Sequence, residues 1–317
     1  MSELNRSVSE NAKSILDQLR TVVVGKDQVL LWVLATILAK GHILLEDIPG
    51  VGKTTMALAF SKTLGLDCNR VQFTPDVLPS DVTGYSVLQQ STGQMVYQDG
   101  AVLCNLFLAD ELNRATSRTQ SALLEAMEEG QVTVDGISHP IPKPFTVLAT
   151  QNPTGAAGTQ LLPDSQMDRF MVRLSMGYPS PEQEVSMVQS RQKSNPLDAL
   201  TPLMDQQALI AMQDIVSNTY VKDDIVQYIV ALINATRNNP NILRGASPRA
   251  TLAVTAMSKA VAQLQGRDYV LPGDVQSVFS LTVAHRILLT PAAQDRNLTA
   301  QQLLAGILHT VKAPSLF

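Results

Sequence analysis

The stretch from Ile43 to Thr55 places the strongest constraint on how this chain can fold. It reads I-L-L-E-D-I-P-G-V-G-K-T-T, an apolar run followed by a glycine-containing turn and then by Lys53 and an apolar-periodic segment. This order predicts a strand, a tight loop and the first turn of a helix. Such a loop directs several backbone N–H groups at one spot, and the helix N-terminus adds a partial positive charge. The sequence therefore predicts a site for a polyphosphate.

The loop also supplies the residue types that such a site needs. Glycines allow the backbone to approach the phosphates, a lysine would reach the β and γ phosphates, and a threonine hydroxyl would ligate Mg²⁺. The usual pattern, G-x-x-x-x-G-K-[ST], begins with glycine where this chain has Asp47, which weakens the match but leaves the mechanism intact. The alternative is a chance match in an ordinary strand–loop–helix connection. The residues that we expect to bind the nucleotide here are Pro49, Gly50, Val51, Gly52, Lys53, Thr54 and Thr55, with Thr54 also at the metal.

A second, weaker pattern lies upstream of this loop. The residues V-V-G-K at 23–26 precede an apolar helix predicted over 27–40, and Val24 and Gly25 are candidates for an adenine pocket. Taken alone, this pattern is better explained as a turn into a core helix.

Composition limits the class of protein. The chain has 317 residues, 45% of them hydrophobic, enough for a large core and about two domains. The net charge is −4, the pI is about 5.6 and no basic tract occurs, so tight, sequence-independent binding to nucleic acid is not expected. Cys68 and Cys104 lie in or beside apolar runs and are expected in the core rather than in a disulfide or metal site. The four histidines show no metal-binding spacing.

No targeting or membrane segment is evident in the sequence. Residues 1–10 are polar and lack the apolar centre of a signal peptide. The longest apolar run, Val29 to Ala39, is shorter than the roughly 20 residues that span a bilayer. We therefore expect a soluble, cytoplasmic protein without a membrane span.

Polar residues follow two apolar strands predicted downstream of the loop. Asp110 and Glu111 end the run 105–109, and Asn152 follows the run 145–150. Ligands of open α/β sheets bind at the carboxyl ends of the strands, so acidic residues at that edge indicate function. Asp110 would hold the Mg²⁺ shell, Glu111 would polarise the attacking water, and Asn152 would hydrogen-bond that water or the γ-phosphate. The alternative is that each strand simply ends in a polar turn.

The remaining segments complete an α/β core and a helical region. Further strands are expected at 69–73 and 170–174, which gives a five-stranded parallel sheet flanked by helices. Two β-hairpins interrupt it, one over 85–97 around S-T-G and one over 131–142 around D-G. After Pro179 and Pro181 the chain becomes helical. The sequence therefore predicts an α/β nucleotide-binding domain over 1–178 and an all-helical lid over 179–317.

Several motifs now agree in order and spacing over roughly residues 20–312, and together they closely resemble the MoxR family of AAA+ ATPases. The motifs that carry the resemblance are LEDIPGVGKT (45–54), QFTPDVLPSDVTG (72–84), LADELNRA (108–115), ALLEAMEEGQVTV (122–134), ATQNP (149–153), LPDSQMDRF (162–170) and GASPRA (245–250). An acidic residue at position 47 is familiar in this family.

The resemblance implies roles for individual residues and for the whole chain. Lys53 and Thr54 match Walker A, and Asp110 and Glu111 match Walker B. Asn152 matches sensor 1. Arg169, which could otherwise form an ordinary surface pair with Asp168, matches an arginine finger that acts in a neighbouring subunit. Arg249 matches sensor 2 in the lid.

For the assembly, the resemblance implies ATP and Mg²⁺ as cofactors and a ring, commonly a hexamer. It also implies chaperone-like remodelling of a protein client, often a protein with a von Willebrand factor A domain.

Three other functions stay open at this stage. A nucleic-acid motor or loader is disfavoured because neither hairpin turn carries lysine or arginine. A nucleotide switch without turnover is disfavoured by the intact set of Asp110, Glu111, Asn152 and Arg169. The motor of a magnesium-chelatase-type metal-insertion enzyme is a close cousin of the remodelling ATPase, and the sequence does not separate the two.

Overall fold

The computed structural model describes residues 3–48, 50–152, 162–193 and 195–315. Its centre is a five-stranded sheet in the order β2-β5-β8-β1-β9, and every pair of neighbouring strands is parallel. This confirms the predicted α/β core. The strands are β1 (Ile43–Glu46), β2 (Cys68–Gln72), β5 (Leu106–Asp110), β8 (Thr146–Gln151) and β9 (Val172–Leu174).

Alternation along the central strands builds two cores, one on each face of the sheet. Leu106 and Leu108 of β5 belong to a core shared with α1, α2 and α3, whereas Phe107 and Ala109 belong to a second core that includes α5. Because both faces are covered, these strands are continuously apolar. The helices of this part are α1 (Glu3–Arg20), α2 (Asp27–Leu38), α3 (Lys53–Thr63), α4 (Pro79–Thr83), α5 (Ser117–Glu129) and α6 (Asp164–Met167).

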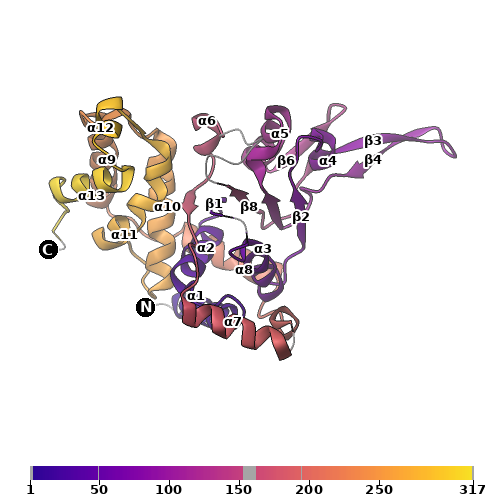
Figure 1. The fold of residues 1–317 in the computed structure, drawn as a ribbon, viewed down its shortest axis with the longest axis horizontal. Helices are drawn as coiled ribbons and strands as arrows, with labels where there is room; N and C mark the ends of the chain where they lie inside the picture. Colours follow the sequence, from indigo (N-terminus) through magenta and orange to yellow (C-terminus); the bar gives the residue numbers. More distant parts are fainter. Residues whose placement is uncertain (1–2, 49, 153–161, 194, 316–317) are drawn as a thin grey trace.

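Both predicted hairpins are present outside the central sheet. The first joins β3 (Gly84–Gln89) to β4 (Gln94–Asp99), and the second joins β6 (Gln131–Val134) to β7 (Ile137–Pro140). The first projects away from the body of the molecule (Figure 1). It exposes apolar side chains and has no Asp, Glu, Lys or Arg between residues 84 and 98.

The chain after residue 180 is mainly helical, as expected, and its part from residue 223 onward lies on the other side of the molecule from the β3–β4 hairpin (Figure 1). It adds a short antiparallel ribbon, β10 (Ile242–Arg244) with β11 (Leu288–Leu289), which the sequence did not predict. The helices are α7 (Pro181–Lys193), α8 (Gln206–Ser217), α9 (Asp223–Arg237), α10 (Pro248–Leu264), α11 (Pro272–Val283), α12 (Pro291–Asp295) and α13 (Ala300–Thr310).

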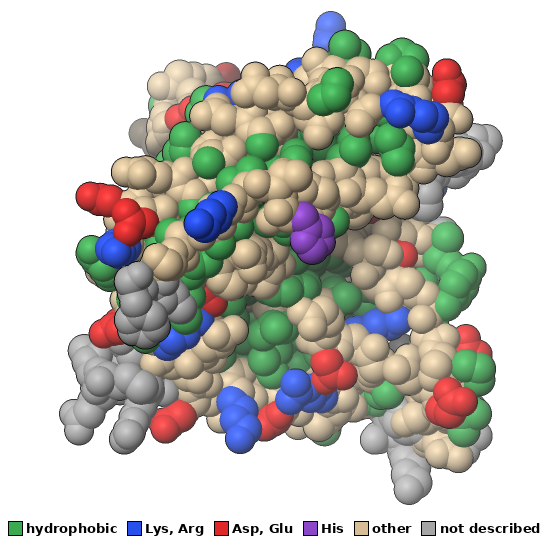
Figure 2. Space-filling model, turned by 90° about the vertical axis from the view of Figure 1, so that its left-hand side faces the viewer, with side chains coloured by type: hydrophobic (Ala, Val, Ile, Leu, Met, Phe, Trp, Pro, Cys, Tyr) green, Lys and Arg blue, Asp and Glu red, His purple; other side chains and the backbone are tan. Residues whose placement is uncertain are grey.

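Two surface properties follow from this arrangement. On the face of the helical region shown in Figure 2, side chains of both charges are scattered among apolar ones, without a basic stripe. Within the described ranges, no helix combines the length and the apolar character needed to cross a bilayer.

Both cysteines are free thiols: Cys104 is buried and Cys68 is partly buried.

Candidate functional site

The glycine loop between β1 and α3 forms an open cradle. Gly50 and Gly52 have φ of 86° and 94°, a conformation that favours glycine, and no atom lies within 4 Å of a Cβ built at either position. Gly52 directly precedes α3, so the free N–H groups of the first helical turn face the same space. Pro49, which we also expected here, lies outside the described residues. The cradle therefore has room for phosphate oxygens close to the backbone.

Lys53 begins α3 and turns back over this loop. Its Nζ donates to the backbone oxygen of Asp47 at 2.7 Å, and burial lowers the pKa of the ammonium group. The neighbouring charges of Asp47, Asp110 and Glu111 act in the opposite direction and favour the charged form. A poorly hydrated ammonium group at the floor of an open loop is suited to bind a phosphate.

The end of β5 brings Asp110 and Glu111 to the same edge of the sheet. Thr150 of β8 bridges them, because its hydroxyl donates to Oδ1 of Asp110 at 2.7 Å and accepts from the backbone N–H of Glu111 at 2.8 Å. Glu111 has φ of 57°, which is unusual for a residue with a side chain. The turn at Glu111 thus separates two adjacent carboxylates into two distinct positions.

The Glu111 carboxylate has one partner on each oxygen. Asn152 donates from Nδ2 to Oε1 at 3.2 Å, and Arg114 donates to Oε2 at 2.7 Å. The Arg114 hydrogen bond lowers the pKa of Glu111, and the Asn152 amide acts in the same direction. Asn113 in turn donates to the backbone oxygen of Asn152 at 3.3 Å. Asn152 therefore holds Glu111 in a fixed orientation at the mouth of the site.

The glycine loop, Lys53 and the side chains at the ends of β5 and β8 line one cavity of about 310 Å³. It also contains a cation that the sequence reasoning missed: Arg70 of β2 donates to Oδ2 of Asp110 at 2.9 Å. Arg70 lies within a short polar strand without a recognisable motif, and only the pairing of β2 with β5 brings it to the site. The residues that line the cavity are Gly50, Gly52, Lys53, Thr54, Thr55, Arg70, Asp110, Glu111 and Asn152.

A nucleotide–metal complex fits the residues of this cavity. The cradle accepts phosphate groups, and Thr54 and Asp110 are the oxygen donors that would complete a Mg²⁺ shell. The Arg70 guanidinium already lies against Asp110, so a cation inside the cavity can reach this carboxylate. Among the described residues, no group of three or more His, Cys, Asp or Glu side chains forms a separate metal site.

A second cavity, of about 400 Å³, adjoins the first and shares Gly50, Gly52 and Thr55 with it. Its other walls are mostly apolar and include Val24, Val51, Met176 and Tyr178. This is the setting in which a base would lie next to the phosphates. Val24, one of the two candidates for an adenine pocket, lines this cavity. Gly25 does not line the cavity, and a Cβ at Gly25 would collide with the side chain of Gln183 in α7.

Asp47, the residue in place of the usual glycine, binds the segment that leads into the helical region. Its carboxylate accepts from the Ser175 hydroxyl at 3.0 Å, from the backbone N–H of Gly177 at 3.2 Å and from that of Met176. Lys26 holds the same segment from the other side, because its Nζ donates to the backbone oxygens at 176, 177 and 178. The phosphate loop and the wall of the base cavity are therefore directly connected.

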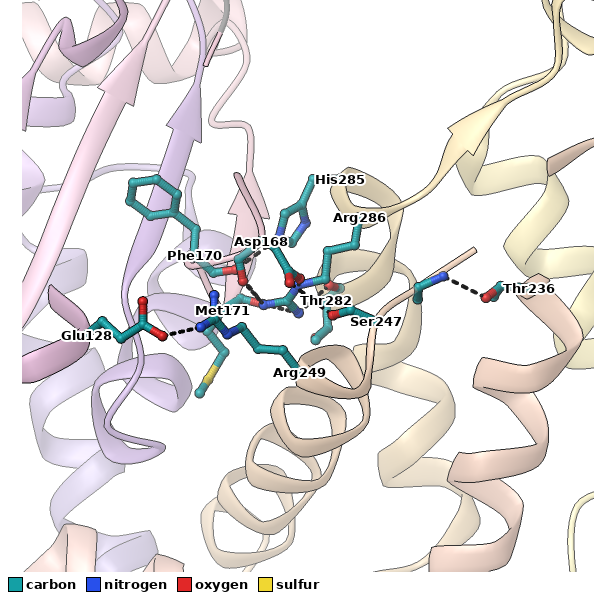
Figure 3. A network of polar contacts seen from close by, with 11 residues as sticks. Glu128, Asp168, Phe170, Met171, Thr236, Ser247, Arg249, Thr282, His285 and Arg286 are labelled. Atoms are coloured by element: carbon teal, nitrogen blue, oxygen red, sulfur yellow. Dashed lines mark hydrogen bonds and ion pairs between the residues drawn. The ribbon is translucent and has the colours of Figure 1, made fainter. Parts of the chain in front are cut away.

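Arg169 and Arg249 lie apart from both cavities and next to each other. Arg169 donates from Nε to Oε2 of Glu128 at 2.9 Å. Arg249 pairs with Oε1 of the same carboxylate, as Figure 3 shows. Hydrogen bonding to Arg169 lowers the pKa of Glu128. The structure thus brings Lys53, Thr54, Asp110, Glu111 and Asn152 together and leaves the two arginines at a separate surface.

Comparison with known proteins was consistent over nearly the whole chain. A family model described as "ATPase family associated with various cellular activities (AAA)" matches residues 42–172, and a model of an AAA lid domain matches residues 234–307. The uncharacterised protein YeaC of Bacillus subtilis is 44% identical over 94% of this chain and 93% of its own length. Chaperone MoxR1 of Mycobacterium tuberculosis is 37% identical over 94% of this chain and 81% of its own.

Among solved structures, a candidate ATPase from Cytophaga hutchinsonii superposes with a TM-score of 0.92. It is 35% identical in sequence, and the match covers 99% of this chain and 98% of the other.

Proposed function

The chain belongs to the MoxR family of AAA+ ATPases, and from this premise we propose that it is an ATP-hydrolysing machine that assembles into a ring and remodels a protein partner. The family implies binding of a nucleotide, usually with Mg²⁺. The finer assignments concern individual residues, the assembly and the client. They rest on the geometry of the cavity, on the position of two separate arginines and, for the client, on the projecting hairpin and a relative's name.

Within one subunit, the proposed roles follow the contacts. Lys53 and the loop N–H groups bind the phosphates, and Thr54 and Asp110 would hold Mg²⁺, which supplies positive charge to the β and γ phosphates when bound. Glu111 orients a water molecule and accepts its proton. Asn152 keeps the Glu111 carboxylate aimed at that water, because it binds one of the two carboxylate oxygens. The adenine would occupy the adjoining apolar cavity beside Val24.

The observation that carries the ring is the position of Arg169 and Arg249. Neither lines the phosphate cavity of its own chain, and both meet at Glu128 on another surface. Hydrolysis needs positive charge on the γ-phosphate in the transition state, and an arginine supplied from outside contributes about 10³–10⁵ in rate in the best-studied NTPases. We assign both arginines to the site of a neighbouring subunit, as in a closed ring, for which a hexamer is our expectation.

The proposed client is a protein rather than a nucleic acid. The relative MoxR1 is named a chaperone, and the projecting β3–β4 hairpin exposes apolar side chains without a single charged residue from 84 to 98. A hairpin that tracks a nucleic-acid backbone needs basic residues. A von Willebrand factor A domain partner, a role in metal insertion and a cytoplasmic location stay predictions from the resemblance and the sequence. The division into domains at residue 178 is likewise proposed.

The test is steady-state ATPase activity measured against protein concentration, together with sizing in ATP and without nucleotide. We expect specific activity to rise with concentration and a larger species to form in ATP. Glu111→Gln and Arg169→Ala should each lower turnover of the assembled protein by at least about 100-fold. Arg20→Ala, which removes an exposed arginine of α1 paired with Asp17 and Asp27, is the matched control and should change little.

Two outcomes would contradict the proposal. A specific activity that is independent of concentration, in a monomer, would exclude shared sites. Full activity of Arg169→Ala in assembled protein would show that Arg169 takes no part in hydrolysis.

A further inference from the structure

One buried guanidinium of the helical region holds the backbone on both sides of Arg169. Arg286 follows α11, and its side chain is only 2% exposed. Its Nη2 donates to the backbone oxygen of Asp168 at 3.0 Å and to that of Phe170 at 2.8 Å (Figure 3). Its Nε lies 2.8 Å from Oδ1 of Asp168. The residues immediately before and after Arg169 are therefore fixed by the same side chain.

Two further side chains of the helical region bind the same segment. His285 donates from Nε2 to the backbone oxygen of Phe170 at 2.9 Å. Burial, followed by the charge of Arg286, keeps the pKa of His285 well below its ordinary value, so the ring is neutral. Ser247, at the start of α10, donates to Oδ2 of Asp168 at 2.9 Å. These contacts are independent of those of Arg286 and point to the same two residues.

The charge and shape of Arg286 suit this task. Burial lowers its pKa to about 10, which still leaves it charged at neutral pH, and the adjacent Asp168 carboxylate compensates for the burial. A planar guanidinium can serve two carbonyls and a carboxylate at once, whereas a lysine ammonium cannot hold this fork. A buried charge is retained only where it is paired. The Arg286 guanidinium has contacts with four described residues: Asp168 and Phe170 on either side of Arg169, and the backbone oxygens of Met171 and Thr282.

The guanidinium of Arg169 itself remains at the surface. It is tethered to Glu128, which also binds Arg249 of α10. From this arrangement we infer that Arg286 is a positioning residue: it fixes the backbone at Asp168 and Phe170 so that Arg169 projects into the nucleotide site of a neighbouring subunit. The inference rests on the proposed function, because it requires Arg169 to act across an interface. It assigns the helical region a task in hydrolysis beyond that of Arg249.

A test must separate presentation of the finger from general damage. Arg286→Met should bind a fluorescent ATP analogue with an affinity within about twofold of wild type, because its own cavity is intact. Its ATPase turnover should fall by about tenfold to 100-fold, as expected when a reacting group is displaced by about 1 Å. Arg267→Met is the matched control. It removes a comparable ion pair, with Asp274 at 2.6 Å and 2.9 Å, that lies elsewhere in the helical region and should leave turnover near wild type.

Mixed assemblies give the decisive measurement. Subunits with Lys53→Ala lack the phosphate lysine but keep an intact Arg169. When mixed with Arg286→Met subunits, they should restore turnover above the sum of the two proteins alone, because they present their finger to the intact cavity of the Arg286→Met neighbour. Arg169→Ala mixed with Lys53→Ala should show the same recovery.

The outcomes distinguish the two levels of the proposal. If Arg169→Ala keeps full activity, or loses activity without recovery on mixing, the finger is not shared, and the proposed function and this inference both fail. If Arg169→Ala recovers on mixing but Arg286→Met keeps its turnover or does not recover, only the inference fails. Should Arg286→Met not fold, Ser247→Ala removes a single hydrogen bond to Asp168. It should lower turnover severalfold with the same recovery, and unchanged turnover would overturn the inference.

Discussion

At the scale of single residues, the balance of charge inside the phosphate cavity is set by two cations and two carboxylates. Lys53 and Arg70 face Asp110 and Glu111 across a space of about 310 Å³. Arg70 neutralises the carboxylate to which a divalent ion would also bind. On the proposed assignment, the guanidinium and Mg²⁺ would compete for Asp110, and either one would shield bound phosphates from that carboxylate.

This competition predicts a metal-dependent effect of Arg70. In Arg70→Ala, the dissociation constant of a fluorescent ATP analogue should rise about tenfold in EDTA, equivalent to about 1.4 kcal/mol, because Asp110 then repels the phosphates. With Mg²⁺ present, the rise should stay below about threefold. Arg173→Ala, which removes the partner of Glu46 outside the cavity, is the control. Equal losses with and without the metal would refute the competition.

The sequence could indicate much of this site and not all of it. Asp110, Glu111 and Asn152 lie at the carboxyl ends of recognisable strands, and parallel strands gather these ends at one edge. Lys53 and Thr54 follow the glycine loop after another such strand. Arg70 lies inside an edge strand, so its place depends on the register with β5. In the sequence, Asp47 is only a departure from the glycine of the usual phosphate-loop pattern. Its carboxylate accepts three hydrogen bonds from residues about 130 positions away, which no local pattern indicates.

At the scale of elements, His42 connects the start of β1 to two neighbours. Its Nδ1 accepts from the backbone N–H of Val147 in β8 at 3.0 Å, and its Nε2 donates to the backbone oxygen of Met127 in α5 at 3.1 Å. Burial lowers the pKa of His42 from 6.5 to about 4. The neutral ring is thus part of the contact between strand and helix.

This contact predicts a loss of stability in acid. Between pH 6.5 and pH 4 the unfolded chain takes up a proton at His42 that the folded chain does not, so the free energy of unfolding falls as the pH falls. The expected loss from this residue is about 2 kcal/mol between pH 7.5 and pH 5. Urea unfolding at the two pH values measures it. His42→Asn should reduce the dependence by about this amount, and the remainder comes in part from His285, which is also buried and neutral. His309→Asn, at an exposed position of α13, should leave the dependence unchanged.

Elements with strong periodicity were predictable, and the smallest ones were not. Apolar runs predicted β5 and β8, and turn residues predicted both hairpins. The predicted ends of these elements lie within one or two residues of the observed ones. The ribbon of β10 and β11 has only two or three residues per strand, too few to show an alternation. Its pairing also joins segments more than 40 residues apart, which no local pattern indicates.

At the scale of the whole molecule, the nucleotide cavities and the helical region are joined by one short segment. Residues 175–178 are bound by Asp47 from the phosphate loop and by Lys26 from the start of α2. The same segment forms a wall of the base cavity and leads into α7. We therefore predict that filling of this cavity and the position of the helical region depend on each other.

Asp47→Asn tests this link. An amide has one acceptor oxygen where the carboxylate serves three donors, so the free energy of unfolding should fall by about 1–3 kcal/mol. The affinity for a fluorescent ATP analogue should fall severalfold, because Met176, which lines the adjoining cavity, loses a hydrogen-bond acceptor that holds its backbone. Asp205→Asn is the control, since Asn also caps a helix well and Asp205 only caps α8. Unchanged affinity in Asp47→Asn would separate the segment from nucleotide binding.

The enclosure of the two cysteines has a practical consequence. Burial raises the pKa of the Cys104 thiol to about 12 and also raises that of Cys68. Only a thiolate reacts readily with maleimides, so we expect Cys104 to react very slowly at neutral pH and the partly buried Cys68 to react more slowly than an exposed cysteine. A single new cysteine at Ser91, in the exposed turn of the projecting hairpin, should therefore be labelled well before either native thiol. The motion of the projecting hairpin can then be followed optically while both native thiols stay in place.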